Sequence, residues 1–369
     1  MKILHAVPSF GLGGMEKVLC SIINSTADKY EHELLAIDNN KEAVKWIKPQ
    51  NVRLIDFHKS DIRHIFFKSL YKIIKARKPH MLMTYNWGAT DAIWLGRLAG
   101  VTKIIHNEHG FNIDEAIALS AKRALVRFFV YRMASKTIVV SHELLSIMKN
   151  KFYLNHRKLT FIPNGINTYY YIQNFSEREK VRAVLGFKNT DFVVGFSGRL
   201  DPVKNFDLMV KVFLHCFRND PHFKLLIIGD GPEKERIENL CKDVNIQKHV
   251  LLAGKKDEVL PCLRALDAFL LTSHREQMPM TILEAMSVGI PVVASKVGEI
   301  PHMIDDGMDG FLVSPNTAPE TWSRILISIK NDDSYKNIGV VARRKIMDKF
   351  QEETMVSCYK NVLESVIHD

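Results

Sequence analysis

Residues 273–295, SHREQMPMTILEAMSVGIPVVAS, carry two glutamates, Glu276 and Glu284, with seven residues between them, in a run that is otherwise mostly apolar. Charged side chains are rarely buried without a partner, so the two acids either lie incidentally on a surface helix or face a polar ligand. One strand-like run, AFLLTS, leads into the stretch, and another, PVVAS, closes it. The pattern predicts a loop that carries Glu276, then a helix that begins near Thr281 with Glu284 in its first turn.

Short apolar strands alternate with segments of helical periodicity along the chain, which is typical of parallel sheets covered on both faces. The alternation occurs twice and breaks near residues 164–176. We expect an α/β protein of two doubly wound, Rossmann-like domains facing a cleft, residues 1–170 and 171–350, with a final helix over about 351–369 that could pack back on the first domain. The expected strands lie within residues 1–7, 32–38, 79–85, 103–109, 136–141, 159–165, 191–200, 223–231, 250–254, 268–273, 291–295 and 310–313.

The composition is that of a soluble globular protein, with 369 residues of which 46% are hydrophobic and 25% charged. A chain of this length favours two domains. Its five cysteines form no C-x-x-C pair, which indicates a reducing compartment and gives no support for a metal site of the zinc-finger type. No apolar run reaches the ~18 residues of a membrane span, and the N-terminal apolar stretch is too short for a signal peptide. We therefore expect a cytoplasmic protein.

The positive charge is confined to the first half of the chain. Residues 1–175 contain 25 lysines and arginines against 13 acids, a net charge of +12, whereas residues 176–369 contain 26 against 28, a net charge of −2. This asymmetry suggests that the two halves face different partners, and that the partner of the first half is anionic.

The informative places in such a fold are the strand-to-helix junctions, because helix N-termini present free N–H groups there. The first junction follows residues 1–7 and reads Gly11-Leu-Gly-Gly, before a helix expected from about Met15 to Ala27. Gly13 and Gly14 let the backbone approach a ligand closely. The spacing is not that of the G-x-G-x-x-G dinucleotide motif, and the alternative is an ordinary turn.

A second junction carries two cations. Arg199 follows the strand that ends at Gly198, and Lys204 comes five residues later, at the start of the next helix. Two cations beside a helix N-terminus suit a diphosphate, although a surface arginine and lysine are also common.

The two glutamates suit the hydroxyls of a sugar. A carboxylate accepts hydrogen bonds from two vicinal hydroxyl groups, so Glu276 and Glu284 could hold the two sugars of one sugar nucleotide. Arg199 and Lys204 would then hold the phosphates between those sugars. On this interpretation ligand hydroxyls satisfy the carboxylates, and the apolar residues between them belong to the core.

In the order and spacing of these features the chain resembles the retaining GT-B glycosyltransferases of family 4, whose signature is a Glu, seven residues and a second Glu. The resemblance covers nearly the whole chain. The residues that carry it are the Gly-Gly-Met-Glu turn, Glu108-His109-Gly110, Val140-Ser141, Pro163-Asn164-Gly165, Gly198-Arg199 with Lys204, Gly229-Asp230-Gly231-Pro232, Glu276 with Pro279, Glu284-Ala-Met, Gly289 and Pro291-Val-Val-Ala-Ser.

The resemblance implies a role for each of the residues at the junctions. Glu284 would bind the ribose hydroxyls, Glu276 the transferred sugar, and Arg199 with Lys204 the diphosphate leaving group. His109 resembles the family histidine that faces the reacting sugar, although a lone histidine is more often structural. The implied catalytic residues are His109, Arg199, Lys204 and Glu276, and the implied donor-binding residues are Gly13, Gly14, Gly198, Arg199, Lys204, Glu276, Gln277, Met278, Pro279, Met280 and Glu284.

Two segments depart from the family pattern near the donor. Gln277 stands where the family usually has glycine, and the usual Gly-Gly-x-Pro-Glu segment reads Gly298-Glu299-Ile300-Pro301-His302. The resemblance implies no cofactor other than the nucleotide-sugar donor, for which a UDP-sugar is preferred over a GDP-sugar on family frequency. No D-x-D motif stands at a strand end, so no metal ion is required. Glu108 is a candidate nucleophile only by adjacency, and the resemblance favours same-face attack in which the leaving phosphate takes the acceptor proton.

Two basic segments in the first half suggest a membrane surface. Residues 62–78 read as an amphipathic helix with Ile62, Phe66, Leu70, Ile73 and Ile74 on one face and basic residues on the other, and residues 120–136 hold five basic residues and no acid. The functional interpretation is peripheral attachment to the anionic inner face of the cell membrane, and the alternative is two ordinary helices with solvated basic sides. No nucleic-acid recognition motif accompanies them. The candidate acceptor or membrane residues are Lys68, Lys72, Lys75, Arg123 and Arg127.

The sequence as a whole therefore predicts a retaining, metal-independent glycosyltransferase that moves a sugar from a nucleotide sugar to a glycan or lipid-linked acceptor, in the synthesis of surface polysaccharide, lipopolysaccharide or glycolipid. Two alternatives stay open. One is an NDP-sugar epimerase of the same architecture, and the other is a non-catalytic subunit that binds sugar nucleotides.

Overall fold

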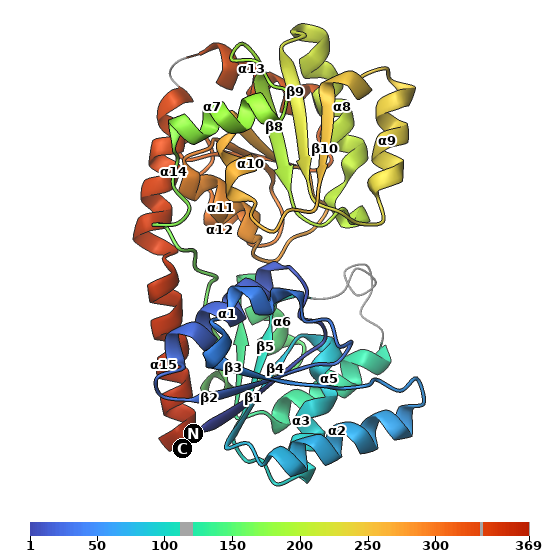
Figure 1. The fold of residues 1–369 in the computed structure, drawn as a ribbon, viewed down its shortest axis with the longest axis vertical. Helices are drawn as coiled ribbons and strands as arrows, with labels where there is room; N and C mark the ends of the chain where they lie inside the picture. Colours follow the sequence, from blue (N-terminus) through green and yellow to red (C-terminus); the bar gives the residue numbers. More distant parts are fainter. Residues whose placement is uncertain (111–120, 333–334, 369) are drawn as a thin grey trace. The chain divides into compact units, whose positions relative to one another are not determined.

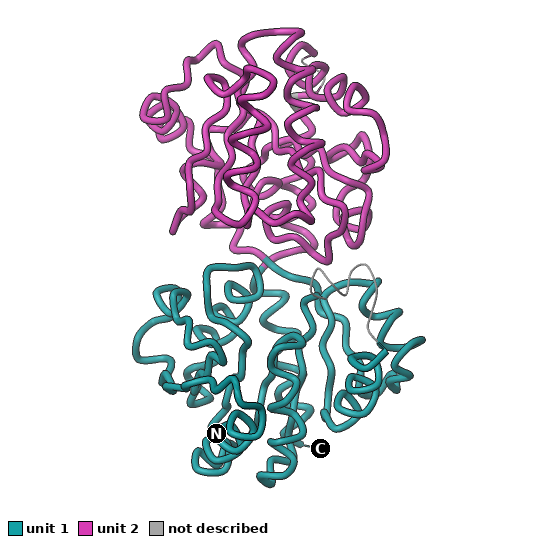
Figure 2. The backbone as a smooth tube through the Cα atoms, turned by 90° about the vertical axis from the view of Figure 1, so that its right-hand side faces the viewer, with its two compact units in different colours: residues 1–165, 352–369 teal, residues 166–351 magenta. Residues whose placement is uncertain are grey.

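The computed structural model describes residues 1–110, 121–332 and 335–368. The chain divides into two compact units, shown in different colours in Figure 2. The first unit contains Met1–Gly165 and Glu352–Asp369, and the second contains Ile166–Gln351. The break after Gly165 lies close to the boundary expected at residue 170, and the final helix belongs to the first unit.

The first unit is built on a parallel sheet with the strand order β3-β2-β1-β4-β5-β6-β7 (Figure 1). The order reverses between β1 and β4, which defines the switch point of a doubly wound sheet. Strand β3 was not expected, because its four residues, VRLI, are partly exposed at the sheet edge and form no apolar run. The strands are β1 Lys2–Val7, β2 Glu31–Ala36, β3 Val52–Ile55, β4 Met81–Tyr85, β5 Ile104–Glu108, β6 Lys136–Val139 and β7 Leu159–Phe161.

Helices cover the first sheet between its strands. The described helices are α1 Gly14–Thr26, α2 Arg63–Arg77, α3 Asp91–Leu98, α5 Ala121–Met133, α6 His142–Asn150 and α15 Glu352–His368. Helix α6 begins where the Ser141 hydroxyl accepts the N–H of Leu144 at 3.1 Å, a standard N-terminal cap. Helix α15 packs on α1, and Lys29 Nζ lies 3.1 Å from Glu364 Oε1 between them.

Helix α2 has the expected amphipathic pattern over a shorter apolar face. Phe66, Leu70 and Ile74 are buried, whereas Ile62 precedes the helix and is 53% exposed. The basic side chains Lys68, Lys72 and Lys75 are exposed. Ile62 lies outside the buried face because the helix begins only at Arg63.

Helix α5 corrects one of the candidate membrane residues. Arg127 has no exposed surface, and its guanidinium lies 4.5 Å from the centre of the Trp87 ring while its Nε donates to the Tyr131 hydroxyl at 3.1 Å. The prediction that Arg127 contacts a membrane surface is therefore wrong, because this arginine is part of the interior of the first unit. Arg123, one turn earlier, is half-buried.

The second unit repeats the architecture with the parallel strand order β10-β9-β8-β11-β12-β13 (Figure 1). All the strands expected in the second half are present. The strands are β8 Phe192–Ser197, β9 Phe223–Ile228, β10 Val250–Gly254, β11 Ala268–Leu271, β12 Val292–Ser295 and β13 Phe311–Val313. The helices are α7 Phe175–Val184, α8 Phe206–Asn219, α9 Lys234–Asp243, α10 Leu260–Arg264, α11 Met280–Val288, α12 Ile300–Met303, α13 Pro319–Asn331 and α14 Lys336–Lys349.

Helix α11 lies in the interior of the second unit. All residues of α11 are buried except Thr281, which is half-buried. The helix packs against α14. The close approach requires glycine at position 339, because a Cβ there would lie 1.9 Å from the carbonyl oxygen of Gly289. Helix α11 ends at Gly289, which has a φ of 84°.

The parallel sheets decide where polar side chains gather. Since the carboxyl ends of parallel strands meet at one edge, Arg199 after β8, Glu276 after β11 and Gly298 after β12 share one edge of the second sheet. In the first sheet, Gly13 after β1, Asn86 after β4 and His109 after β5 follow strands that end at one edge in the same way.

Candidate functional site

Lys204 and Glu276 form an ion pair at the carboxyl edge of the second sheet. Lys204 Nζ lies 2.6 Å from Glu276 Oε1, and the Ser273 hydroxyl donates to the same oxygen at 2.6 Å. The Glu276 side chain is 9% exposed and the Lys204 side chain 18%. The sequence predicted ligand partners for both charges, but in the structure they satisfy each other, because β8 and β11 are neighbours in the sheet.

A threonine ties together the two loops that carry this pair. The Thr272 hydroxyl lies 3.0 Å from the carbonyl oxygen of Lys204 and 3.1 Å from that of Asn205. Lys204 is the last residue of a short 3-10 turn, Pro202–Lys204, and α8 begins two residues later. The prediction placed Lys204 at the start of this helix, whereas in the structure it precedes the helix.

Arg199 has a different environment from Lys204. Its side chain is 74% exposed, and its Nε lies 3.1 Å from Asp201 Oδ2. An exposed guanidinium of this kind is screened by water and can exchange its carboxylate for another anion at little cost. The Arg199 guanidinium is thus accessible to an anion from solvent, whereas the Lys204 ammonium is already paired with Glu276.

Glu284 lies deeper than the sequence predicted. It is the fifth residue of α11, so it falls in the second turn and not in the first, and it is 2% exposed. The Tyr171 hydroxyl donates to Glu284 Oε1 at 3.1 Å. Burying a carboxylate requires such a donor, because the lost hydration must be replaced. Neither Tyr171 nor Ser273 was among the predicted site residues, although the run of tyrosines at 169–171 was a visible signal.

The segment after β12 packs closely against the backbone of the loop that carries Glu276 and Gln277. A Cβ at Gly298, where φ is 55°, would lie 1.7 Å from the carbonyl oxygen of Glu276, and the N–H of Glu299 donates to the carbonyl of Gln277 at 3.0 Å. The glycine is therefore required by the close approach of two backbones. The predicted donor-binding residues of this loop divide into half-buried Gln277 and buried Met278, Pro279 and Met280.

His109 lies at the end of β5 in the first unit. Its backbone N–H donates to Asn86 Oδ1 at 2.7 Å, and its ring stacks on Tyr85 at a centroid distance of 6.4 Å. Burial lowers the pKa of His109 to about 4, against a smaller opposite effect of Glu108. The imidazole is consequently neutral at pH 7 and able to donate from one nitrogen and accept at the other. Asn86, which has a φ of 53°, was not predicted from the sequence.

Glu108, next to His109, is fully buried. Its Oε2 accepts a hydrogen bond from the Tyr131 hydroxyl at 2.6 Å and lies 3.7 Å from His106 Nε2. These contacts within the first unit give this carboxylate a structural role, which weakens its candidacy as a nucleophile.

The glycine turn leads directly into α1, as predicted. Gly13 is the N-terminal cap, and Gly14 is the first helical residue. Glu16, in the first turn, was not predicted as a site residue. Burial raises the pKa of Glu16 to about 7, with a further contribution from Asp38, whereas a backbone hydrogen bond lowers it.

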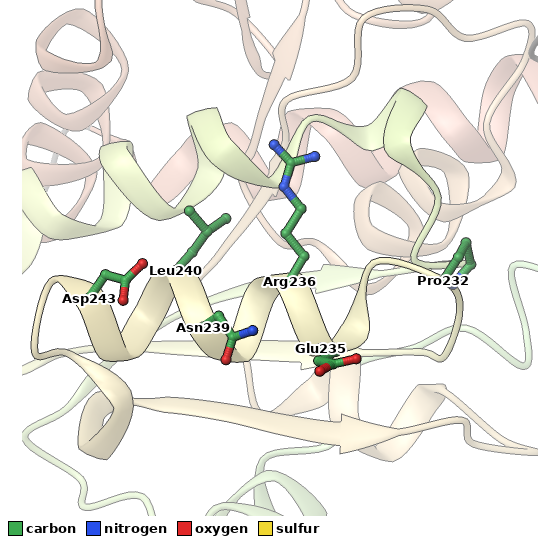
Figure 3. A pocket seen from close by; sticks show the side chains of 6 residues that line it. All are labelled: Pro232, Glu235, Arg236, Asn239, Leu240 and Asp243. Atoms are coloured by element: carbon green, nitrogen blue, oxygen red, sulfur yellow. The ribbon is translucent and has the colours of Figure 1, made fainter.

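A surface hollow of about 400 Å³ lies along α9 (Figure 3). Its one arginine, Arg236, lies 2.7 Å from Asp207 and 3.3 Å from Glu233, so the guanidinium is already paired. We assign no role to this hollow. The residues that line it are Pro232, Glu235, Arg236, Asn239, Leu240 and Asp243.

Two family models match the chain, and each lies mainly in one of the two units. The model described as Glycosyltransferase Family 4 matches residues 12–170, and the model described as Glycosyl transferases group 1 matches residues 177–345. Together with the two doubly wound sheets, they show that this chain belongs to the glycosyltransferases of the GT-B fold. The prediction of a glycosyltransferase and the prediction of the GT-B fold class are confirmed.

Individual relatives agree with this assignment. The UDP-Gal:alpha-D-GlcNAc-diphosphoundecaprenol alpha-1,3-galactosyltransferase of Escherichia coli is 29% identical over 82% of this chain and 78% of its own length. The N-acetyl-alpha-D-glucosaminyl L-malate synthase of Bacillus anthracis is 26% identical over 72% of this chain and 69% of its own length. The crystal structure of Anabaena Alr3699/HepE in complex with UDP and glucose has a TM-score of 0.85 at 21% identity, over 99% of this chain and 100% of that one.

Proposed function

We propose that this glycosyltransferase moves a sugar, with retention of configuration, from a nucleotide-sugar donor to a lipid-linked or glycan acceptor in the synthesis of surface polysaccharide, lipopolysaccharide or glycolipid. The observation that carries the proposal is the Lys204–Glu276 ion pair at the carboxyl edge of the second sheet, with the buried carboxylate of Glu284 eight residues after Glu276. Such an edge is where doubly wound sheets bind nucleotides.

The donor would be recognised through its hydroxyls and its charge. Glu284 is assigned to the ribose hydroxyls and Glu276 to the transferred sugar, since carboxylates accept from vicinal hydroxyl groups. Arg199 and Lys204 are assigned to the diphosphate, together with the backbone of Gly198. The buried loop residues after Gln277 support the position of Glu276.

The chemistry follows from the charge that develops in the transition state. The bond between the anomeric carbon and the β-phosphate oxygen breaks, the acceptor oxygen bonds to the same face of that carbon, and the acceptor proton passes to the departing phosphate. Arg199, Lys204 and the helix N-terminus after Gly13 and Gly14 would stabilise the negative charge, each direct contact being worth roughly 3 kcal/mol. His109 is proposed to contact the reacting sugar as a neutral imidazole. Because no D-x-D motif stands at a strand end, we propose a reaction that needs neither metal nor cofactor.

A UDP-sugar is the preferred donor. The Escherichia coli relative is named for UDP-Gal, and the Anabaena structure contains UDP and glucose. These names support uridine over guanosine as the base for this chain. The same Escherichia coli name includes a diphosphoundecaprenol, which supports a lipid-linked acceptor.

A lipid-linked acceptor would be reached most simply from the membrane surface. The first unit exposes Lys68, Lys72 and Lys75 on α2, and on α5 it exposes Leu125 and Phe129 to 60% each. Basic and apolar side chains together favour an anionic bilayer, with about 1 kcal/mol per basic residue near the surface. We therefore propose peripheral attachment to the inner face of the cell membrane and no nucleic-acid partner. Among the described helices, none combines the length and the apolar character needed to cross a membrane.

Turnover with and without an acceptor tests the proposed reaction. UDP-galactose, UDP-glucose and UDP-N-acetylglucosamine would be incubated with the protein, alone and with a bacterial lipid extract, and UDP release would be measured. Release that depends on the extract supports transfer. Conversion of the donor sugar without an acceptor would indicate an epimerase, and binding of UDP without turnover under either condition would indicate a non-catalytic subunit. A sedimentation assay with vesicles of phosphatidylglycerol at low salt tests attachment, and protein that stays in the supernatant would refute it.

A further inference from the structure

Three consecutive tyrosines lie in the segment between β7 and α7, and one of them differs from the other two. Tyr169 is 78% exposed and Tyr170 is 44% exposed, whereas Tyr171 is 8% exposed. A buried tyrosine hydroxyl normally finds a hydrogen-bond partner. For Tyr171 that partner is the carboxylate of Glu284, at 3.1 Å.

The position of Tyr171 is itself determined by contacts to its backbone. Its carbonyl oxygen accepts hydrogen bonds from the Ser287 hydroxyl at 2.9 Å and from Arg343 Nη1 at 2.9 Å. Arg343, from α14, also donates to the carbonyls of Ser287 and of Thr168. One guanidinium therefore connects α11, α14 and the segment that carries the tyrosine.

Helix α11 contacts Tyr171 at two points one turn apart. Glu284 accepts from the tyrosine hydroxyl, and Ser287, three residues later, donates to the tyrosine carbonyl. On a helix, residues three apart lie on the same face, so the two contacts are made by neighbouring side chains. Tyr171 is therefore held at its phenol hydroxyl and at its backbone carbonyl, and the hydroxyl in turn limits the rotamers of the Glu284 side chain.

We propose that Tyr171 is a positioning residue that orients the Glu284 carboxylate for the two vicinal hydroxyls of the donor ribose. This inference rests on the proposed function, in which Glu284 binds the ribose. A carboxylate has about four lone-pair sites, and the Tyr171 hydroxyl occupies one of them on Oε1. Fixing the carboxylate before the ligand arrives reduces the ordering cost of binding, so the hydroxyl should contribute to ribose recognition without touching the ligand.

The test measures nucleotide binding by calorimetry with two probes, UDP and 2′,3′-dideoxy-UDP, which lacks both hydroxyls. The preference of the protein for UDP over the dideoxy probe reports the ribose contact alone. Tyr171→Phe should reduce this preference about tenfold, the usual effect of one hydrogen bond to a charged group, and leave the affinity for the dideoxy probe within about twofold of wild type. Tyr169→Phe removes the same atom from an exposed ring two residues away, and it should change neither affinity.

The possible results separate the inference from the proposal on which it depends. If Glu284→Gln loses the preference for UDP but Tyr171→Phe keeps it, the positioning role of Tyr171 is refuted and the ribose site stands. If Tyr171→Phe weakens both probes equally, the tyrosine is merely structural. If wild type shows no preference, the ribose role of Glu284 fails. Should wild type not bind UDP, the GDP and ADP pairs replace it, and failure of all three overturns the donor proposal together with this inference.

A second variant guards against a folding effect of the tyrosine change. Ser287→Ala removes the hydroxyl that holds the Tyr171 carbonyl and leaves the phenol intact. It should reduce the preference for UDP in the same direction by about twofold to threefold. An unchanged preference in a folded Ser287→Ala protein would contradict the part of the inference that places Tyr171 under the control of α11.

Discussion

The ion pair between Lys204 and Glu276 predicts an unusual effect of removing a carboxylate from a binding site. In the unliganded chain, the Lys204 ammonium lies 2.6 Å from the Glu276 carboxylate. A donor phosphate that binds Lys204 therefore competes with this carboxylate. Glu276→Gln keeps the shape of the side chain and its capacity to accept from Ser273 but removes the charge. The variant should therefore bind UDP more tightly than wild type while losing sugar transfer.

The size of the effect follows from the geometry of the pair. Two unit charges 2.6 Å apart at an effective dielectric of about 20 attract each other by roughly 6 kcal/mol, most of which is offset by lost hydration. Hydrogen bonds to charged groups retain about 1.5–3 kcal/mol net. Since both side chains keep some exposure, we take the lower value, which corresponds to UDP binding about tenfold tighter for Glu276→Gln.

Calorimetric titration of UDP into five proteins, namely wild type, the two single variants, the double variant and one control, checks this reasoning. Lys204→Met should bind UDP at least tenfold more weakly than wild type, and the double variant should fall between the two single ones. Asp201→Asn is the matched control, because it neutralises the carboxylate beside Arg199, whose 74% exposed side chain is screened by solvent, and it should change the affinity less than twofold. Weaker or unchanged UDP binding by Glu276→Gln would refute the competition.

Three further predictions concern a buried histidine, an asparagine with positive φ and a glycine at a close backbone contact. Burial lowers the pKa of His32 from 6.5 to about 4, so the unfolded chain binds a proton there that the folded chain does not, and stability should fall by about 3 kcal/mol as the pH drops from 6.5 to 4. Urea unfolding of wild type and a His32→Gln variant over this range checks it, and equal pH slopes would contradict it. Asn86→Ala should destabilise the first unit by about 2 kcal/mol, because it removes the hydrogen bond to His109 and places a Cβ-bearing residue without a polar side chain at a φ of 53°. Asn86→Gly should lose only the contribution of the hydrogen bond. Equal unfolding free energies for the two variants would contradict a contribution from backbone strain. Gly298→Ala should lower the melting temperature and abolish UDP binding, because its Cβ would lie 1.7 Å from a loop carbonyl oxygen, and Gly307→Ala, with a similar positive φ and open space, should retain binding.

Much of the fold could be predicted because its signals are local. Most of the longer strands contain a short apolar run, such as LLII in β9, and α11 is bounded by Pro279 and by Gly289 in the left-handed conformation. Strands, helices and their order could therefore be predicted from short windows of sequence. Strand β3 was not predicted, because its four partly exposed residues at the sheet edge form no apolar run that a short window of sequence would reveal.

The side-chain environments could not be predicted in this way. Arg127 was expected on a basic surface, yet it is buried against Trp87, a ring forty residues earlier in the chain, and nothing in its own helix indicates this contact. The face that a helix buries depends on what the rest of the unit brings against it. Lys204 and Glu276 were each predicted to contact a ligand. In the structure they form an ion pair with each other, although they are 72 residues apart in the sequence.

The family, the fold of two parallel sheets and the junctions at which polar residues gather could thus be predicted from the amino-acid sequence. These features depend on the spacing of apolar residues and on the residue types in turns, which are local properties of the chain. The partners of those residues could not be predicted from the sequence. The pairing of Lys204 with Glu276 and the contact of Tyr171 with Glu284 join positions 72 and 113 residues apart, and such contacts arise only when the strand order of the second sheet and the packing of α11 bring distant segments together.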